Sequence, residues 1–152
     1  MFIGWRASLR SGILSFMKSL LIACSEGRLT ETLQRLQTRR RADGADRLLV
    51  PGGPLVLTRP GMERRVALDS IRGLIESNDI RRILCVSHQD CGFYERSLGG
   101  LGFDQREILE RDLRRVRTLL ENEFPGVEVG CWFVPWQENG QGAAFGEPLR
   151  VT

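Results

Sequence analysis

Short apolar runs alternate with longer amphipathic stretches along most of this 152-residue chain. Runs of this length are typical of strands, whereas apolar residues that recur every three to four positions are typical of helices. The pattern predicts four strands, over residues 20–23, 47–50, 82–87 and 127–134. It predicts three helices between them, over residues 30–39, 63–77 and 104–123. Such alternation predicts an α/β domain with a mainly parallel sheet, because each crossover helix returns the chain to the same end of the sheet.

Thr30 is expected to cap the first of these helices. Val66 and Ser70 are expected among the buried residues of the second helix. The third helix has a core-facing stripe of Leu109, Leu113, Val116 and Leu120. Residues 140–152 have weak periodicity and are expected to be irregular.

We expect the four strands to lie in the order 2-1-3-4, with helices on both faces of the sheet. In that order the chain winds one way from the first strand to the second and the other way from the first strand to the third. Open parallel sheets bind ligands at the carboxyl ends of the strands where the winding changes direction. Functional residues are therefore expected just after residues 23 and 87.

The composition fits one globular domain, with 41% hydrophobic and 27% charged residues. A chain of this size buries roughly 70% of its unfolded surface, which is enough for one core. No apolar run approaches the ~18 residues that a membrane span needs, so we expect no membrane partner. The net charge of +3 is mild, and the arginines of residues 104–123 alternate with acids. That alternation predicts a solvated helix surface and argues against a nucleic acid partner.

Residues 1–18 differ from the rest of the chain because they carry three basic residues and no acid. Their large apolar residues fall roughly on one helical stripe. Three interpretations stay open: an extension upstream of a start at Met17, a targeting-like segment, or an amphipathic arm that docks on a partner subunit. We favour an extension or a dimerisation arm, since the apolar stretch is short and no small-residue cleavage motif follows. Residues 19–152 are expected to form the single α/β domain.

Two of the predicted strands end in residues that bind metals. His88, the one histidine of the chain, and Cys91 follow the third strand, while Cys24 follows the first. Zinc accepts thiolate and imidazole ligands together, and a His-x-x-Cys spacing lets one loop deliver both. An isolated pair of this kind is better explained as a capped turn with a buried thiol. The cysteine at the matching end of the first strand favours a metal site.

The other two cysteines, Cys85 and Cys131, lie inside predicted strands. Free cysteines pack in such positions as small apolar side chains. The four cysteines therefore favour a reducing, cytoplasmic setting over a disulfide-linked secreted scaffold.

Two spaced motifs, Cys-x-acid-x-Arg after one strand and His-x-x-Cys-Gly after a later one, together resemble the β class of carbonic anhydrases. The resemblance covers roughly residues 19–140. It implies that Cys24, His88 and Cys91 bind Zn²⁺, and that Glu26 and Arg28 form the catalytic acid–arginine pair beside the metal. It also implies reversible hydration of carbon dioxide to bicarbonate by a homodimer or higher homo-oligomer.

The chain departs from the family pattern at three places. The acid is Glu26 where the family has aspartate, residues 50–54 replace an Arg-Asn-x-Gly type of loop, and Phe93 stands where small residues usually follow Cys-Gly. The longer acid either keeps its role or ligates zinc and closes the site. Two alternatives therefore stay open: a carbonic-anhydrase-like zinc-binding protein without hydration activity, and a zinc hydrolase acting on another small molecule.

Overall fold

The structure is a computed structural model that describes residues 17–98, 105–140 and 142–152. Its centre is a five-stranded sheet in the order β2-β1-β3-β4-β7. These strands are β1 (Ser19–Cys24), β2 (Asp46–Val50), β3 (Arg82–His88), β4 (Glu128–Val134) and β7 (Leu149–Val151). The first four are parallel and lie in the predicted order, and β7 adds an antiparallel edge beside β4. The predicted fold class is therefore confirmed.

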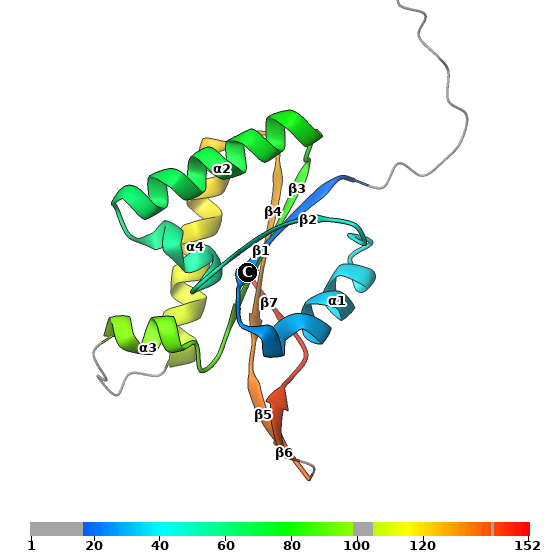
Figure 1. Ribbon diagram of the computed structural model, residues 1–152, viewed down its shortest axis with the longest axis vertical. Helices are drawn as coiled ribbons and strands as arrows, with labels where there is room; N and C mark the ends of the chain where they lie inside the picture. Colours follow the sequence, from blue (N-terminus) through cyan, green and yellow to red (C-terminus); the bar gives the residue numbers. More distant parts are fainter. Residues whose placement is uncertain (1–16, 99–104, 141) are drawn as a thin grey trace, which may run out of the picture.

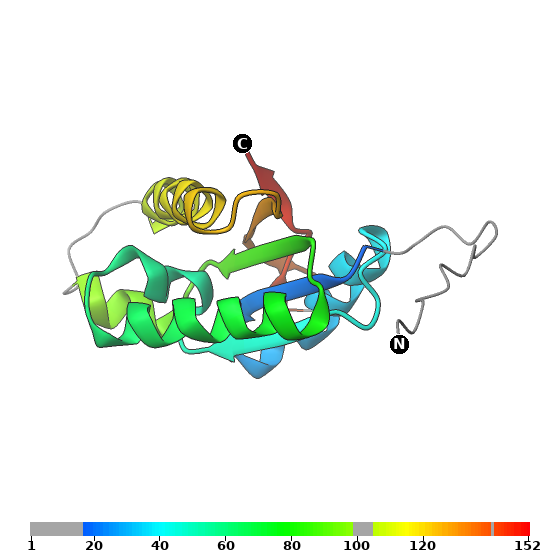
Figure 2. The same cartoon turned by 90° about the horizontal axis from the view of Figure 1, so that it is seen from above.

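The described residues form four α-helices and two short 3-10 helices. They are α1 (Thr30–Arg39), α2 (Met62–Asn78), α3 (Gly92–Leu98), α4 (Gln105–Glu123), η1 (Gly27–Leu29) and η2 (Gly53–Thr58). Figure 1 shows α1 on one face of the sheet and α2, α3 and α4 on the other. Right-handed crossovers explain this division, because the steps from β1 to β2 and from β2 to β3 run in opposite directions. Figure 2 shows the same layers from above.

The core lies where both faces of the sheet are covered. Every residue of β1 is buried, and so is every residue of β3 after Arg82. Strands covered on both faces are continuously apolar, which is why these two runs stand out in the sequence. The helix α4 packs mainly against β4, and the stripe predicted for it is also buried: Leu109, Leu113, Val116 and Leu120.

Two predictions for α2 are wrong. Val66 and Ser70 were expected to face the core, but both are exposed, and Val66 keeps 58% of its surface. The helix contacts the core through Ala67 and Ile71, so Val66 falls one step outside the buried stripe. It lies instead on the rim of an apolar groove between β2 and α2.

The prediction of irregular structure for residues 140–152 is also wrong. The described residues there form β6 (Gly142–Phe145) and β7, and β6 pairs antiparallel with β5 (Trp136–Asn139). Strands of three or four residues are too short to produce a periodic signal. The β5–β6 hairpin extends beyond the carboxyl end of β4, at the same end of the sheet as the carboxyl ends of β1 and β3 (Figure 1).

Residues 1–16, which make up most of the predicted extension or dimerisation arm of residues 1–18, lie outside the described residues. Among the described residues, no helix is both long and apolar enough to cross a membrane.

Candidate metal centre

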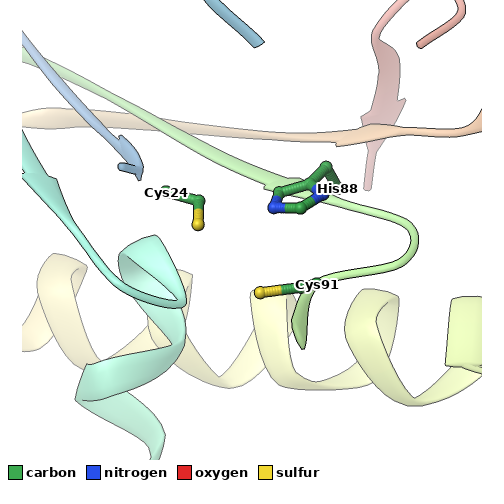
Figure 3. Close-up of side chains that lie close together, drawn as sticks. All are labelled: Cys24, His88 and Cys91. Atoms are coloured by element: carbon green, nitrogen blue, oxygen red, sulfur yellow. The ribbon is translucent and has the colours of Figure 1, made fainter. Parts of the chain in front are cut away.

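Two adjacent parallel strands deliver the first two candidate ligands. Cys24 is the last residue of β1 and His88 is the last residue of β3. Cys91 comes from the turn that follows, where Asp90 adopts a φ of 57° and reverses the chain. Aspartate tolerates this left-handed conformation better than most residues. Figure 3 shows the three side chains pointing toward one another, and their ligand atoms all lie within 4.8 Å of one another.

The His88 ring is oriented as a metal ligand requires. Its Nδ1 lies 2.7 Å from the backbone oxygen of Gln89, so the ring donates there in the tautomer protonated at Nδ1. Its Nε2 is buried and has no hydrogen-bond partner among the described residues. An unpartnered buried nitrogen costs free energy, and a hydrogen bond at Nδ1 is the usual support for a ligating Nε2. Together with two sulfur atoms, this nitrogen fits the preference of zinc.

The two candidate sulfur ligands differ in acidity. A hydrogen bond from the Cys91 thiol, opposed by burial, lowers the pKa of Cys24 from 9.0 to about 4. The neighbouring His88 ring and the backbone of Glu26 and Gly52 contribute further to lowering this pKa. The Cys24 thiolate and burial in turn raise the pKa of Cys91. The pair therefore holds one proton at neutral pH, which a divalent cation would displace if it bound there.

Glu26 and Arg28 lie directly after Cys24, at the start of η1. Arg28 Nε donates to Glu26 Oε1 over 2.8 Å, and Arg28 Nη2 donates to Glu26 Oε2 over 3.2 Å. These hydrogen bonds lower the pKa of the Glu26 carboxyl, which stays ionised. Among the described residues, the carboxylate does not join the group formed by Cys24, His88 and Cys91. Both of its oxygens are instead turned to the guanidinium.

The hydroxyl of Thr30 secures this turn in a way that sequence reasoning missed. Thr30 was expected to cap α1 from outside, but it is the first helical residue and donates to the backbone oxygen of Gly27 over 2.8 Å. The short η1 helix takes up the residues between the strand and α1. It thereby keeps Glu26 and Arg28 close to the end of β1.

A cavity of about 550 Å³ opens beside the three candidate ligands. Phe93 forms part of its wall and is 38% exposed, whereas Tyr94 is buried in the core. Arg96 reaches the same cavity from α3, one turn beyond Phe93. The sequence did not single out Arg96, because the apolar pattern after Cys91 is too short to predict α3.

Sequence comparison finds two relatives whose activity is not stated. No family model matches the sequence. An uncharacterised protein of Rickettsia conorii is 26% identical over 118 residues, which are 73% of this chain and 63% of that protein. An uncharacterised protein of Rickettsia bellii is 25% identical over 118 residues, covering 73% of this chain and 72% of the relative. The chain thus matches less than two thirds of the length of the first relative.

Solved structures with a similar fold are carbonic anhydrases. The carbonic anhydrase of Streptococcus mutans has a TM-score of 0.51 and 18% identity, covering 94% of this chain and 88% of its own. A variant of the β-carbonic anhydrase CafD of Aspergillus fumigatus has a TM-score of 0.53 and 12% identity, covering 93% and 92%. A tetrameric β-carbonic anhydrase of Sordaria macrospora has a TM-score of 0.50 and 14% identity, covering 79% and 76%. The chain has the fold of the β-carbonic anhydrases.

Proposed function

We propose that this chain is a zinc-dependent enzyme that interconverts carbon dioxide and bicarbonate, with Cys24, His88 and Cys91 as its zinc ligands. The observation that carries the proposal is the buried, unpartnered Nε2 of His88, in a side-chain group with Cys24 and Cys91 whose ligand atoms all lie within 4.8 Å of one another. When bound at three protein ligands, zinc lowers the pKa of a coordinated water from 15.7 toward ~7 and so supplies hydroxide at neutral pH.

Glu26 and Arg28 have separate roles in this proposal. Glu26 is ionised and accepts hydrogen bonds only, so it orients the attacking water by accepting from its O–H. Arg28 binds both carboxylate oxygens and keeps them from joining the three candidate ligands. A forked hydrogen bond fixes the plane of a carboxylate as well as its distance. The Arg96 guanidinium at the cavity attracts the bicarbonate anion, while Phe93 offers an apolar wall to carbon dioxide.

Metal analysis followed by a stopped-flow hydration assay tests the proposal. We expect one zinc per chain in the wild type, and loss of both zinc and hydration activity in Cys24→Ser and Cys91→Ser. Cys131→Ala is the matched control, since Cys131 is also buried but lies inside β4, outside the candidate ligand group. Wild type and Glu26→Asp both zinc-loaded and both inactive would contradict hydration. That result would favour the zinc-binding protein without activity or the hydrolase for another small molecule.

We further propose a homodimer or higher homo-oligomer. The apolar groove between β2, η2 and α2 supports it, with a volume of about 420 Å³ and a rim that includes Met62, 70% exposed, and Val66. Monomeric proteins rarely leave contiguous apolar surface uncovered without a use for it. Solution mass measured with and without residues 1–16 tests whether these residues form the dimerisation arm. A stable, monodisperse full-length monomer would contradict this proposal.

We also propose a cytoplasmic location. All four cysteines are free in the structure, and two of them are needed as thiolates for the metal. Oxidising compartments convert neighbouring thiols to disulfides, so the proposed site needs a reducing one. Cell fractionation with detection of this chain tests the location.

A further inference from the structure

The β5–β6 hairpin brings two aromatic rings to the Arg28 side chain. The Arg28 Cζ lies 5.1 Å from the centre of the Trp136 ring and 5.5 Å from the centre of the Phe145 ring. Both distances are within the range of cation–π attraction. The hydrogen bonds to Glu26 use the Nε and Nη2 edge of the guanidinium, so the rings and the carboxylate contact different parts of one planar group. We call Trp136 and Phe145 the aromatic clamp.

The aromatic clamp is also connected to the metal ligands. The Phe145 ring packs edge-on against His88 at 5.1 Å between centroids, and edge-on against Trp136 at 4.9 Å. The backbone nitrogen of Trp136 donates to Gln89 Oε1 over 2.9 Å. The backbone oxygen of the same Gln89 accepts from His88. One residue of the metal loop thus fixes both the imidazole and the base of the hairpin.

Arg28 needs such support. Its side chain is 56% exposed and that of Glu26 is 28% exposed. An exposed ion pair contributes little by itself, because water competes for both partners and two long side chains must be ordered. Without further contacts the guanidinium would leave the carboxylate for part of the time, and Glu26 would then be free to turn toward the metal. Contact with two rings restricts the guanidinium to the orientation in which it binds Glu26.

We propose that the aromatic clamp positions Arg28, and through Arg28 the Glu26 carboxylate, for the reaction at the metal. Trp136 and Phe145 are positioning residues, since they contact Arg28 and His88 rather than the reacting atoms. This inference rests on the proposed function for its kinetic consequence. Its structural consequence, an ordered Arg28 guanidinium next to two rings, can be measured whether or not the chain hydrates carbon dioxide.

The structural test is ¹⁵N NMR of the arginine Nε–H groups in the zinc-loaded full chain. The signal of Arg28 is identified by its absence in Arg28→Lys. We expect it to be shifted upfield by the aromatic rings and protected from exchange with water. In Trp136→Leu the signal should move toward the other arginine signals and exchange faster. Phe145→Leu is the second variant, in case Trp136→Leu fails to fold.

A matched control comes from the other side of the molecule. The Arg72 guanidinium lies 5.5 Å from the Phe124 ring, so Phe124→Leu removes a contact of the same kind that involves neither the candidate ligands nor the residues lining their cavity. The Arg28 signal should be unchanged in Phe124→Leu. An Arg28 signal that is equally unchanged in Trp136→Leu and Phe145→Leu would overturn the inference.

The kinetic test separates positioning from a general role in folding. Trp136→Leu should lower kcat about two- to five-fold at unchanged zinc content, and Trp136→Tyr should restore most of it. In an Arg28→Ala background the change Trp136→Leu should have no further effect, because its route of action is already removed. A full additional loss in that background would overturn the inference. A wild type without hydration activity would contradict the proposed function instead, and the NMR result would still decide on the clamp.

Discussion

Gly53 packs directly against the backbone of Cys24. A Cβ placed on Gly53 would lie 2.6 Å from the Cys24 nitrogen and 2.7 Å from the Ala23 carbonyl carbon. Its φ of 57° is also one that residues with a side chain rarely adopt. The loop after β2 therefore reaches the end of β1 only because residue 53 lacks a side chain. This contact helps to determine where the first candidate ligand stands.

We expect Gly53→Ala to destabilise the fold and weaken zinc binding together. The new methyl group meets backbone rather than a flexible side chain, so either the loop or the end of β1 must move, at a cost of about 1–3 kcal/mol. Chemical denaturation and a zinc competition assay measure the two effects. Gly73→Ala, in the middle of α2 with open space around its Cβ position, is the control and should be neutral or stabilising by up to ~1 kcal/mol. Equal behaviour of the two variants would contradict the packing argument.

The metal-free protein should contain one thiolate at neutral pH. Cys24, whose pKa is lowered to about 4, carries the charge, and the raised pKa of Cys91 keeps its proton in place. Thiolate ultraviolet absorbance should therefore persist from pH 8 down to about pH 5 and disappear as the pH falls through about 4. Cys24→Ser should remove this absorbance in the same range, whereas Cys131→Ser should not. Absorbance that vanishes just below pH 9 in the wild type would show that Cys24 is an ordinary thiol.

The central sheet could be predicted because the apolar patterns of its strands and of the helices that cover them recur along the chain. β1 and β3 are apolar throughout since helices cover both faces, and α4 has a complete buried stripe. The edge elements carry no such signal. β6 and β7 have four and three residues, too few for a period to emerge, and they form because β5 and β4 offer them partners.

The candidate ligands could be predicted for a related reason. The carboxyl ends of the adjacent parallel strands β1 and β3 lie at the same end of the sheet, so Cys24, His88 and Cys91, whose side chains are of kinds that bind metals, come together there. The aromatic clamp could not be predicted in the same way. Trp136 and Phe145 are ordinary apolar residues in the sequence, and only the hairpin brings them to Arg28 and His88.

Asp112 should make the stability of the fold depend on pH. Its side chain is 8% exposed in α4, and burial raises its pKa although Arg115 and Arg59 act in the opposite direction. A carboxyl group whose pKa is higher in the folded than in the unfolded chain stabilises the fold most below the unfolded value of about 3.9. That contribution is lost as the pH rises through the raised folded value. Asp112→Asn removes this pH dependence. The unfolding free energy of the variant should therefore increase relative to that of the wild type as the pH rises from about 3 toward neutrality.

Asp69→Asn is the control for this measurement. Asp69 lies in α2, pairs with Arg72 three residues on, and keeps 71% of its side chain exposed. Denaturation curves of all three proteins over the same pH range isolate the effect of burial. A difference between Asp112→Asn and wild type that does not change with pH would contradict it.

Changes to the Arg28–Glu26 pair should alter the hydration rate but leave the amount of zinc bound per chain unchanged. Arg28→Ala frees the Glu26 carboxylate, and loss of a supporting partner beside a metal typically lowers activity by about 10–100-fold. Arg28→Lys should not restore the rate, because an ammonium group cannot bind both oxygens in one plane. Since both oxygens are already directed to Arg28, the wild type should be active near neutral pH, and Glu26→Asp should not raise its rate. Arg35→Ala breaks the exposed ion pairs of Arg35 with Glu31 and Glu147 and serves as the control. A large gain in Glu26→Asp would mean that Glu26 closes the site in solution, and an Arg28→Ala rate equal to that of Arg35→Ala would remove the pair from the reaction.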